Sequence, residues 1–267
     1  MQETLQFERI DDNQLLYRSQ EFEIPGLEGS RPLRLWLPPD YYKSEQPWPL
    51  ALFFDGQNIF DDEGTIAGGW HLDRILTERA AAKKPVPVVL ALHHGPHRDQ
   101  EMCPRDPFPG QSGKARLLLD WLDTFLLPRA FRKLHLRKEP AQTLIGGSSL
   151  GGLLALYALF YYPQNYGRAL VMSPALWPDQ FSIFQDIMLA KAHAKARVYI
   201  DHGEKEAPPE MPDIGRILFD QSKLMGDVLS VIGFDDKRMR WHADPEGEHN
   251  ENSWRRRLPA ALEFLYS

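Results

Sequence analysis

The sequence has little cysteine, no long apolar run and no large excess of charge of one sign, and each scarcity excludes a class of protein. Its single cysteine, Cys103, cannot form a disulfide within the chain, so a reducing compartment, the cytoplasm, is the simplest expectation. The longest nearly apolar run, at 153–162, is too short to cross a bilayer, which takes about 18 residues or more. The opening residues, MQETLQFERIDDNQ, are charged and lack the apolar segment of a secretory signal.

The composition is that of a globular protein with no strong electrostatic preference. Acidic and basic residues are interspersed and the net charge is −6, which argues against nucleic acid as the main partner. The basic cluster FRKLHLRK, at 131–138, is interpreted as a helix end exposed to solvent. With 267 residues, of which 43% are hydrophobic, the chain can bury a large core without disulfides.

The domain organisation is expected to be simple. There is no internal repeat and no low-complexity linker, so residues 1–267 are predicted to form a single α/β domain. No membrane partner is expected. The oligomeric state is left open, with a homo-oligomer among the options.

Apolar stretches alternate with amphipathic ones along most of the chain. Strands are predicted at 33–39, 48–56 and 86–95, and then at QTLIGG, GRALVMSPA, ARVYIDHG and KRMRWHAD. Helices are predicted at 68–84, ARLLLDWLDTFLLPRAF (kinked or ended by Pro128), LGGLLALYALFYY, FSIFQDIMLAKAHA, GRILFDQSKLMGDVLSVIG and NSWRRRLPAALEFLY. This alternation predicts a mostly parallel sheet with helices on both faces, and any chemistry at the carboxyl ends of the strands.

A glycine-rich stretch, LIGGSSLGGLLALYALFYY at 144–162, contains one match to G-x-S-x-G. The match places Ser149 at a sharp strand-to-helix turn, where a serine hydroxyl is exposed and flanking glycines relieve crowding. The N–H group of Leu150, at the start of the helix, can then donate to an oxyanion. The alternative is a glycine-rich turn that only permits tight packing. The position between a buried strand and a helix favours Ser149 as a nucleophile.

A serine nucleophile needs a base, and His249 is the best placed of the nine histidines. It lies in the polar loop DPEGEHNENSW, after the last predicted strand and before the last helix. The alternative is a loop histidine that makes an ordinary hydrogen bond.

Six of the other histidines fall into two groups. Three fall in helical patterns and are expected to pack or face solvent: His71, His135 and His193. Three more cluster after a strand: His93, His94 and His97. Neighbouring histidines diverge in direction and no carboxylate completes a set, so no metal site is predicted.

A histidine base also needs an acceptor that fixes its tautomer. The segment HGEKEAPPE, after a predicted strand, offers Glu206 and Glu204. Glu206 is favoured because Gly203 can turn the chain and direct the acid towards His249, while Glu204 remains a competitor. Asp201, at the end of the strand, is expected to be committed to the sheet. The chain order of serine, acid and histidine is that of α/β-hydrolases.

The second oxyanion donor is expected from the loop after an earlier strand. The stretch FFDGQNIF places Gln57 there, and Gly56 would let its backbone N–H approach the oxyanion. A plain Asp-Gly turn is the alternative.

Three stretches together resemble the putative esterase family, which includes esterase D and the enterochelin esterases. They are LWLPPDYYKSEQPWPLALFFDGQNIF, IGGSSLGGLLALYALFYYPQNYGRALVMSPALW and EGEHNENSWRRRLPAALEFLY. The resemblance implies an α/β-hydrolase fold and ester hydrolysis through an acyl-enzyme. On matching positions it implies Ser149 as nucleophile, His249 as base, and an oxyanion hole from Gln57 and Leu150. It supports Glu206 as the acid but leaves Glu204 open, and some members of the family use a Ser–His dyad.

The resemblance also suggests substrate contacts. RDQEMCP, at 98–104, looks like a stretch of the family in which an arginine precedes an acidic and an aromatic residue, with Met102 in the place of the aromatic. Arg98 and Trp177 are taken as candidate substrate-binding residues. Three tryptophans are expected near strand ends or loops, where they could line a pocket for an aromatic or sugar-like group: Trp70, Trp177 and Trp254. The alternative is that they only pack in the core or at its rim.

The predicted activity is that of a serine carboxylesterase acting on a small-molecule ester, with no cofactor and no metal. Two alternatives remain. An acyltransferase would differ only in whether water or another alcohol accepts the acyl group. A binding protein could retain the fold without turnover, although it would not need a serine, a histidine and an acid together.

Overall fold

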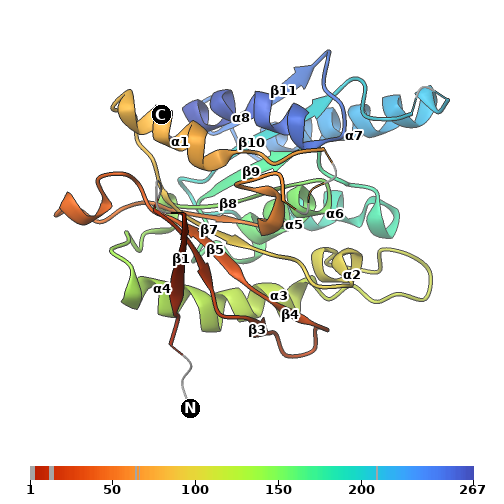
Figure 1. The fold of residues 1–267 in the computed structure, drawn as a ribbon. Coiled ribbons are helices and arrows are strands. Elements are labelled where there is room, and N and C mark those ends of the chain that lie inside the picture. The colour runs from red at the N-terminus through yellow and green to blue at the C-terminus, as the bar shows by residue number, and fades with distance from the viewer. Residues whose placement is uncertain (1–3, 12–14, 64, 66, 209) are drawn as a thin grey trace.

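The computed structural model describes all residues except 1–3, 12–14, 64, 66 and 209 (Figure 1). Its main sheet has nine strands. In spatial order they are β1 (Phe7–Asp11), β2 (Leu16–Ser19), β5 (Leu33–Trp36), β7 (Val88–Leu92), β6 (Leu50–Phe53), β8 (Thr143–Ser148), β9 (Arg168–Met172), β10 (Arg197–Gly203) and β11 (Met239–Asp244).

The strands from β7 to β11 in this order are parallel, whereas β1, β2 and β5 pair antiparallel and extend the sheet at one side. A separate two-stranded sheet joins β3 (Phe22–Glu23) to β4 (Ser30–Arg31). The parallel part consists of the strands that the apolar runs predict. Its central strands are buried along their whole length, as expected when helices cover both faces.

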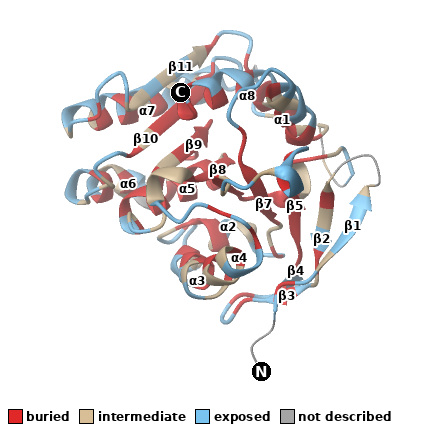
Figure 2. Cartoon of the chain, turned by 90° about the vertical axis from the view of Figure 1, so that its left-hand side faces the viewer, coloured by how far each residue is buried: buried red, intermediate tan, exposed pale blue. Residues whose placement is uncertain are grey.

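The helices form two layers around the sheet (Figure 2). One core includes residues of α1 (Leu72–Ala81) and α8 (Glu251–Leu265). The larger core includes residues of α3 (Ala115–Trp121), α4 (Leu127–Lys133), α5 (Leu150–Tyr161), α6 (Pro178–Leu189) and α7 (Pro212–Val231). The short helix α2 (Arg98–Met102) follows β7. Short 3-10 turns lie at Tyr41–Lys43, Gly56–Asn58 and Pro140–Gln142.

The sequence pattern misplaces some elements. Of the two outcomes predicted for Pro128, a kink or an end of the helix, the end is wrong: Pro128 lies in the first turn of α4, after the π-helical segment Leu122–Leu126. Proline lacks an N–H group, and the wider π turn takes up the disruption. The sequence pattern does not predict the strands β1 to β4 or the helix α2. β1, with the sequence FERID, has no buried residue, and β3 and β4 have only two residues each. The described part of the chain holds no helix that is both long and apolar enough to cross a bilayer.

Candidate active site

Ser149 lies at a strained corner between β8 and α5. Its backbone angles, φ 57° and ψ −122°, fall in a region that residues other than glycine rarely adopt. Three backbone hydrogen bonds fix this corner. The Ser149 N–H donates to the carbonyl of Met172, while the Ser149 carbonyl accepts from the N–H groups of Leu153 and Ala175, all at 3.0 Å. The strain is therefore held by β9 and the first turn of α5.

The glycines around Ser149 are in close contacts that a side chain would disturb. A Cβ atom at Gly147 would lie 2.7 Å from the backbone carbon of Gly151, and a Cβ at Gly151 would lie 3.2 Å from Oδ2 of Asp55. Ser148 is buried, whereas Ser149 is partly exposed. Of the two adjacent serines, Ser149 is the one with the strained turn and the accessible side chain.

A cavity of about 400 Å³ opens above this corner and brings distant segments together. Both Ser149 and His249 line it, as do Gln57, Arg98 and Trp254. These residues come from the ends of β6 and β8, from α2, and from the start of α8. The predicted nucleophile, base and oxyanion loop therefore share one cavity.

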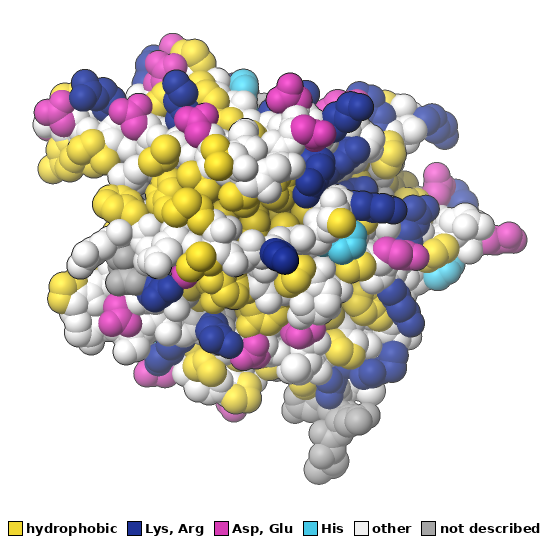
Figure 3. All heavy atoms as spheres, turned by 180° about the vertical axis from the view of Figure 1, so that it is seen from behind, with side chains coloured by type: hydrophobic (Ala, Val, Ile, Leu, Met, Phe, Trp, Pro, Cys, Tyr) yellow, Lys and Arg dark blue, Asp and Glu magenta, His cyan; other side chains and the backbone are white. Residues whose placement is uncertain are grey.

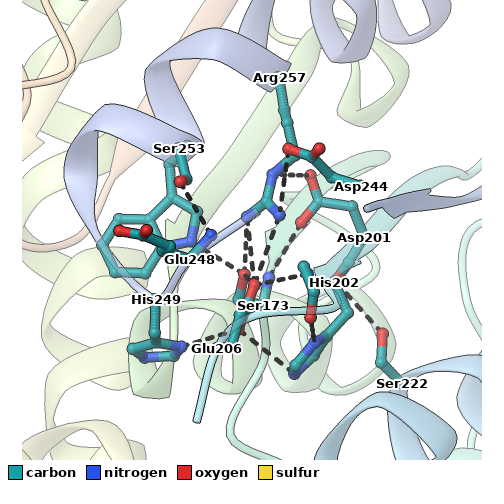
Figure 4. A network of polar contacts seen from close by, with 12 residues as sticks. Ser173, Asp201, His202, Glu206, Ser222, Asp244, Glu248, His249, Ser253 and Arg257 are labelled. Atoms are coloured by element: carbon teal, nitrogen blue, oxygen red, sulfur yellow. Dashed lines mark hydrogen bonds and ion pairs between the residues drawn. The ribbon is translucent and has the colours of Figure 1, made fainter. Parts of the chain in front are cut away.

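The imidazole of His249 is oriented by Glu206. Its Nδ1 lies 2.8 Å from Oε2 of Glu206 (Figure 4). Because an ionised carboxylate only accepts hydrogen bonds, Nδ1 carries the proton and Nε2 is left free to act as a base. The edge of the Trp254 ring packs against the His249 ring, with 5.2 Å between centroids. At the start of α8, Asn250 caps the N–H of Ser253, and the Ser253 hydroxyl accepts from the Glu248 N–H, so the loop that carries His249 is fixed.

Glu206 is fully buried and its second oxygen is held by three groups. Oε1 accepts from the Ser173 hydroxyl at 2.5 Å and from the Gly203 N–H at 2.6 Å, and Arg257 lies 3.4 Å away. Ser173 in turn accepts from Arg257 at 2.8 Å and from the indole N–H of Trp254 at 2.9 Å. Its own proton therefore points to Glu206. The carboxylate is fixed at both oxygens.

The charges around Glu206 keep it ionised. Burial raises the pKa of Glu206, but the hydrogen bond from His249 and the charges of the two nearby histidines outweigh burial and lower it overall. Behind it, Nε of Arg257 lies 3.2 Å from Oδ2 of Asp201. Burial raises the pKa of Asp201 to about 7, although Arg257 opposes the rise. Arg257 therefore faces two buried acids, of which Glu206 is the one that remains charged under acidic conditions.

A second histidine, His202, also contacts Glu206. Its Nδ1 lies 2.8 Å from the carbonyl of Gly203, which can only accept, so Nδ1 is the protonated nitrogen. Its Nε2 faces Oε2 of Glu206 at 3.3 Å. Burial lowers the pKa of His202, against the raising effect of Glu206. In its neutral form, His202 thus presents an unprotonated nitrogen to the acid.

The structure separates the three acids that the sequence offers. Glu206 contacts His249, the predicted base. Glu204 is exposed, and its side chain makes no hydrogen bond or ion pair with the described residues. Asp201 is buried within β10, but its carboxylate pairs with Arg257 and accepts from the Ser173 N–H at 3.1 Å. It therefore supports the acid from behind.

The predicted oxyanion donors lie at two helix starts. Leu150 is the first residue of α5, and Gln57 lies in the first turn of the 3-10 segment Gly56–Asn58, so neither N–H is needed within its own helix. Asp55, just before this segment, has a left-handed backbone with φ 53°. A Cβ atom at Gly56 would lie 2.5 Å from the carbonyl oxygen of Ala91, so only glycine fits there.

Arg98 is bound to the oxyanion loop. Its Nε and Nη2 atoms each lie 2.7 Å from one oxygen of the buried carboxylate of Asp55. Its side chain is 27% exposed and lines the cavity. Met102 is buried, and its sulfur lies 3.9 Å from a Cβ atom placed on Gly151, so it packs behind the nucleophile corner. Arg98 thus acts on the loop through Asp55, and only its remaining edge can reach a substrate.

The three tryptophans occupy different places. Trp177 precedes α6 and packs against Phe108, with 5.4 Å between ring centroids, and it is not among the residues that line the cavity of Ser149. Trp70 is buried against Trp254. Only Trp254 reaches the cavity, and it also supports the base and Ser173.

Most of the other histidines lie apart from the site. The three expected in helices lie outside them: His71 precedes α1 and pairs with Asp62, and His135 and His193 follow the ends of helices. The other three diverge: His93 is largely buried, His94 lines the cavity with Nδ1 on the carbonyl of Gly95, and His97 pairs with Glu28. Within the described ranges, no three His, Cys, Asp or Glu side chains gather as a metal site would require.

Sequence reasoning missed Ser173, His202 and Arg257. Ser173 follows β9 directly and has a positive φ of 42°, so its position at a strand end was an available signal. Arg257 shares a helical face with the buried residues Trp254, Leu258 and Ala261, at spacings of three and four. An arginine at a core position of an amphipathic helix indicates a buried acid.

Comparison with known proteins identifies the family. A family model described as putative esterase matches residues 24–265. The chain belongs to the putative esterase family. The matched range contains Ser149, Glu206 and His249, and family membership supports ester hydrolysis as the activity.

Two relatives and one solved structure illustrate the likeness. The chain is 24% identical over 245 residues to the uncharacterized protein YbbA of Bacillus subtilis. The match covers 89% of this chain and 93% of that protein. It is 30% identical over 143 residues to the iron(III) enterobactin esterase of Dickeya dadantii, which covers 52% of this chain. The chain spans only 28% of that relative. Siderophore hydrolase EstA from Aspergillus nidulans superposes with a TM-score of 0.72 at 19% identity, covering 98% of both chains. The fold is the α/β-hydrolase fold.

Proposed function

We propose that this protein is a serine esterase that works through an acyl-enzyme, with Ser149 as nucleophile, His249 as base and Glu206 as acid. The observation that carries the proposal is the orientation of His249. Its Nδ1 is committed to a buried carboxylate at 2.8 Å, and the ring lines the same cavity as the strained Ser149. A loop histidine with no catalytic role would not need a buried, triply held acid behind it.

The chemistry follows from the free nitrogen. The Ser149 hydroxyl attacks the ester carbonyl carbon while Nε2 of His249 takes the hydroxyl proton. The negative charge on the carbonyl oxygen is met by the N–H groups of Leu150 and Gln57. When the C–O bond to the alcohol breaks, His249 returns the proton to the departing alcohol. A water molecule, deprotonated by His249, then attacks the acyl-enzyme and releases the acid and free Ser149.

Glu206 stabilises the imidazolium that forms at each step. Its charge is maintained by donors on both oxygens, and Arg257 lies behind it. An acid held in this way does not need to move when His249 gains its proton, and this preorganisation lowers the barrier.

For the substrate we propose a siderophore-type ester as the first class to test. The support is the 30% identity to an iron(III) enterobactin esterase and the structural likeness to a siderophore hydrolase. The cytoplasmic location and the absence of nucleic-acid and membrane partners stay predictions. Trp177 stays a candidate substrate contact outside the cavity.

The test is active-site labelling combined with a panel of esters. A fluorophosphonate probe is expected to label the wild type, to fail with Ser149→Ala and to label His249→Ala weakly. Ser148→Ala is the matched control and should label normally, because Ser148 is buried beside the nucleophile. The panel should contain p-nitrophenyl esters, one catecholate-siderophore ester and one feruloyl ester. Wild-type protein that neither labels nor hydrolyses any ester would refute the proposal.

A further inference from the structure

Exposed hydrophobic side chains are concentrated on one part of the surface. Of the 13 large hydrophobic side chains that are exposed among the described residues, eight lie on α6, on α7 or at the residue before α7. Figure 3 shows hydrophobic side chains gathered on the side of the molecule where Figure 1 places these two helices. Scattered exposed hydrophobic residues are ordinary, but a contiguous group of them marks an interaction surface.

On α7 these side chains form a line. Ile217, Leu224 and Val231 recur every seven residues, close to two helical turns, with exposures of 52%, 51% and 86%. They lie on the side of the helix away from its buried residues, such as Met225 and Leu229. Leu189, the last residue of α6, is 76% exposed. We call the line formed by Ile217, Leu224 and Val231 the α7 stripe.

Four charged residues flank the α7 stripe in alternating order: Arg216, Asp220, Lys223 and Asp227. All four are exposed, and none makes an ion pair with another described residue. Along the helix their charges run positive, negative, positive, negative. If a second α7 runs in the opposite direction, each positive charge therefore faces a negative one. The centre of this charge pattern lies between Gln221 and Ser222.

A second α7 that runs antiparallel about this point would match the charges. Asp220 would face Lys223 of the other copy, and Arg216 would face Asp227, with each pair formed twice by the two-fold symmetry. The same operation places Ile217 of one copy and Leu224 of the other on the same half of the interface, about 3 Å apart along the helix axis, because they lie about 4.5 and 2.5 residues from the centre.

We propose that this protein forms a two-fold symmetric dimer in which α7 of one copy packs antiparallel on α7 of the other, with the α7 stripe at its centre. An α7 of 20 residues is about 30 Å long. Helix α6 contacts α7 and would add to the interface, for which about 800 Å² per partner is typical. The dimer does not depend on the proposed esterase activity.

The first test is sedimentation equilibrium of the full chain. The wild type is expected to be a dimer, and Leu224→Glu is expected to be a monomer with unchanged circular dichroism. Leu117→Glu is the matched control, because Leu117 is an exposed leucine, 42% exposed, on α3 outside the stripe. It should stay dimeric. A wild type that is monomeric over the whole concentration range overturns the proposal, as does a dimer that survives Leu224→Glu.

A charge exchange tests the antiparallel register. Asp220→Lys places two lysines opposite each other, and Lys223→Asp places two aspartates opposite each other, so each variant alone should dissociate about 100-fold more readily. Mixing the two variants restores both pairs and should give a heterodimer, and the double variant should dimerise with itself. Dimers of each single variant as tight as the wild type, or a failure of both the mixture and the double variant to recover, would refute this register.

Discussion

Replacing Glu206 with glutamine tests the proposed triad most sharply, because the surroundings decide which way the new amide must point. Three donors converge on Oε1 of Glu206: the Ser173 hydroxyl, the Gly203 N–H and Arg257. In Glu206→Gln the amide oxygen must therefore take the Oε1 position, because an NH₂ group there would face those donors. The amide nitrogen then takes the Oε2 position.

At that position the NH₂ group would donate to two acceptors. One proton would reach Nδ1 of His249, 2.8 Å from the present oxygen, and the other would reach Nε2 of His202, at 3.3 Å. The variant should therefore fold without an unsatisfied buried group. However, His249 would now accept at Nδ1 and carry its proton on Nε2, the nitrogen that must act as a base. With the wrong tautomer, kcat/KM should fall about 10⁴-fold, equivalent to about 5 kcal/mol of barrier.

The assay is kcat/KM for a short-chain p-nitrophenyl ester, with the His249 tautomer followed by ¹⁵N NMR and folding followed by urea unfolding. Glu204→Gln is the matched control and should keep wild-type activity, because Glu204 is exposed and apart from His249. Activity of Glu206→Gln within tenfold of the wild type would show that Glu206 does not set the tautomer of His249.

Three further perturbations probe the corner, the oxyanion loop and the buried histidine. Gly147→Ala places a Cβ 2.7 Å from the Gly151 backbone, so kcat/KM should fall about 100-fold as the corner shifts, and wild-type kinetics would contradict the corner geometry. Arg98→Met leaves the buried Asp55 carboxylate unpaired and should cost about 3–5 kcal/mol in urea unfolding; adding Asp55→Asn should recover part of this, and no recovery would contradict the pairing. Burial, with the Arg34 charge, lowers the pKa of His93 from 6.5 to about 4. Because the unfolded chain binds this proton more readily than the native state, the free energy of unfolding should fall by up to about 3 kcal/mol as pH falls from 6.5 to 4. His93→Gln should flatten this slope, and an unchanged slope in urea unfolding at several pH values would show that another group is responsible.

The fold class and the proposed nucleophile, Ser149, are readable from the sequence because both depend on local patterns. Alternating apolar and amphipathic runs predict the parallel strands from β6 to β11 and the helices between them. The tight turn at Ser149 is encoded by glycines only a few residues away, where backbone contacts leave no room for a side chain. His249 could be proposed as the base because the fold class predicts which loop carries it.

The residues that hold Glu206 could not be predicted in the same way, because they come from segments far apart in the chain. Ser173, Glu206 and Arg257 meet only when β9, β10 and α8 pack together, and no local period records that meeting. The same applies to Arg98. The sequence suggests it as a substrate contact, whereas in the folded chain its guanidinium donates to Asp55.

The sequence by itself determined the order of the strands from β5 to β11 and of the longer helices, the turn at Ser149 and the loop that carries His249, since each follows from residues near one another in the chain. Only the tertiary structure shows that Glu206, and not Glu204, contacts His249. Both are glutamates two positions apart in the chain, so propensity and charge are equal for both. The difference is burial: one carboxylate is enclosed among donors from three elements, and the other faces water.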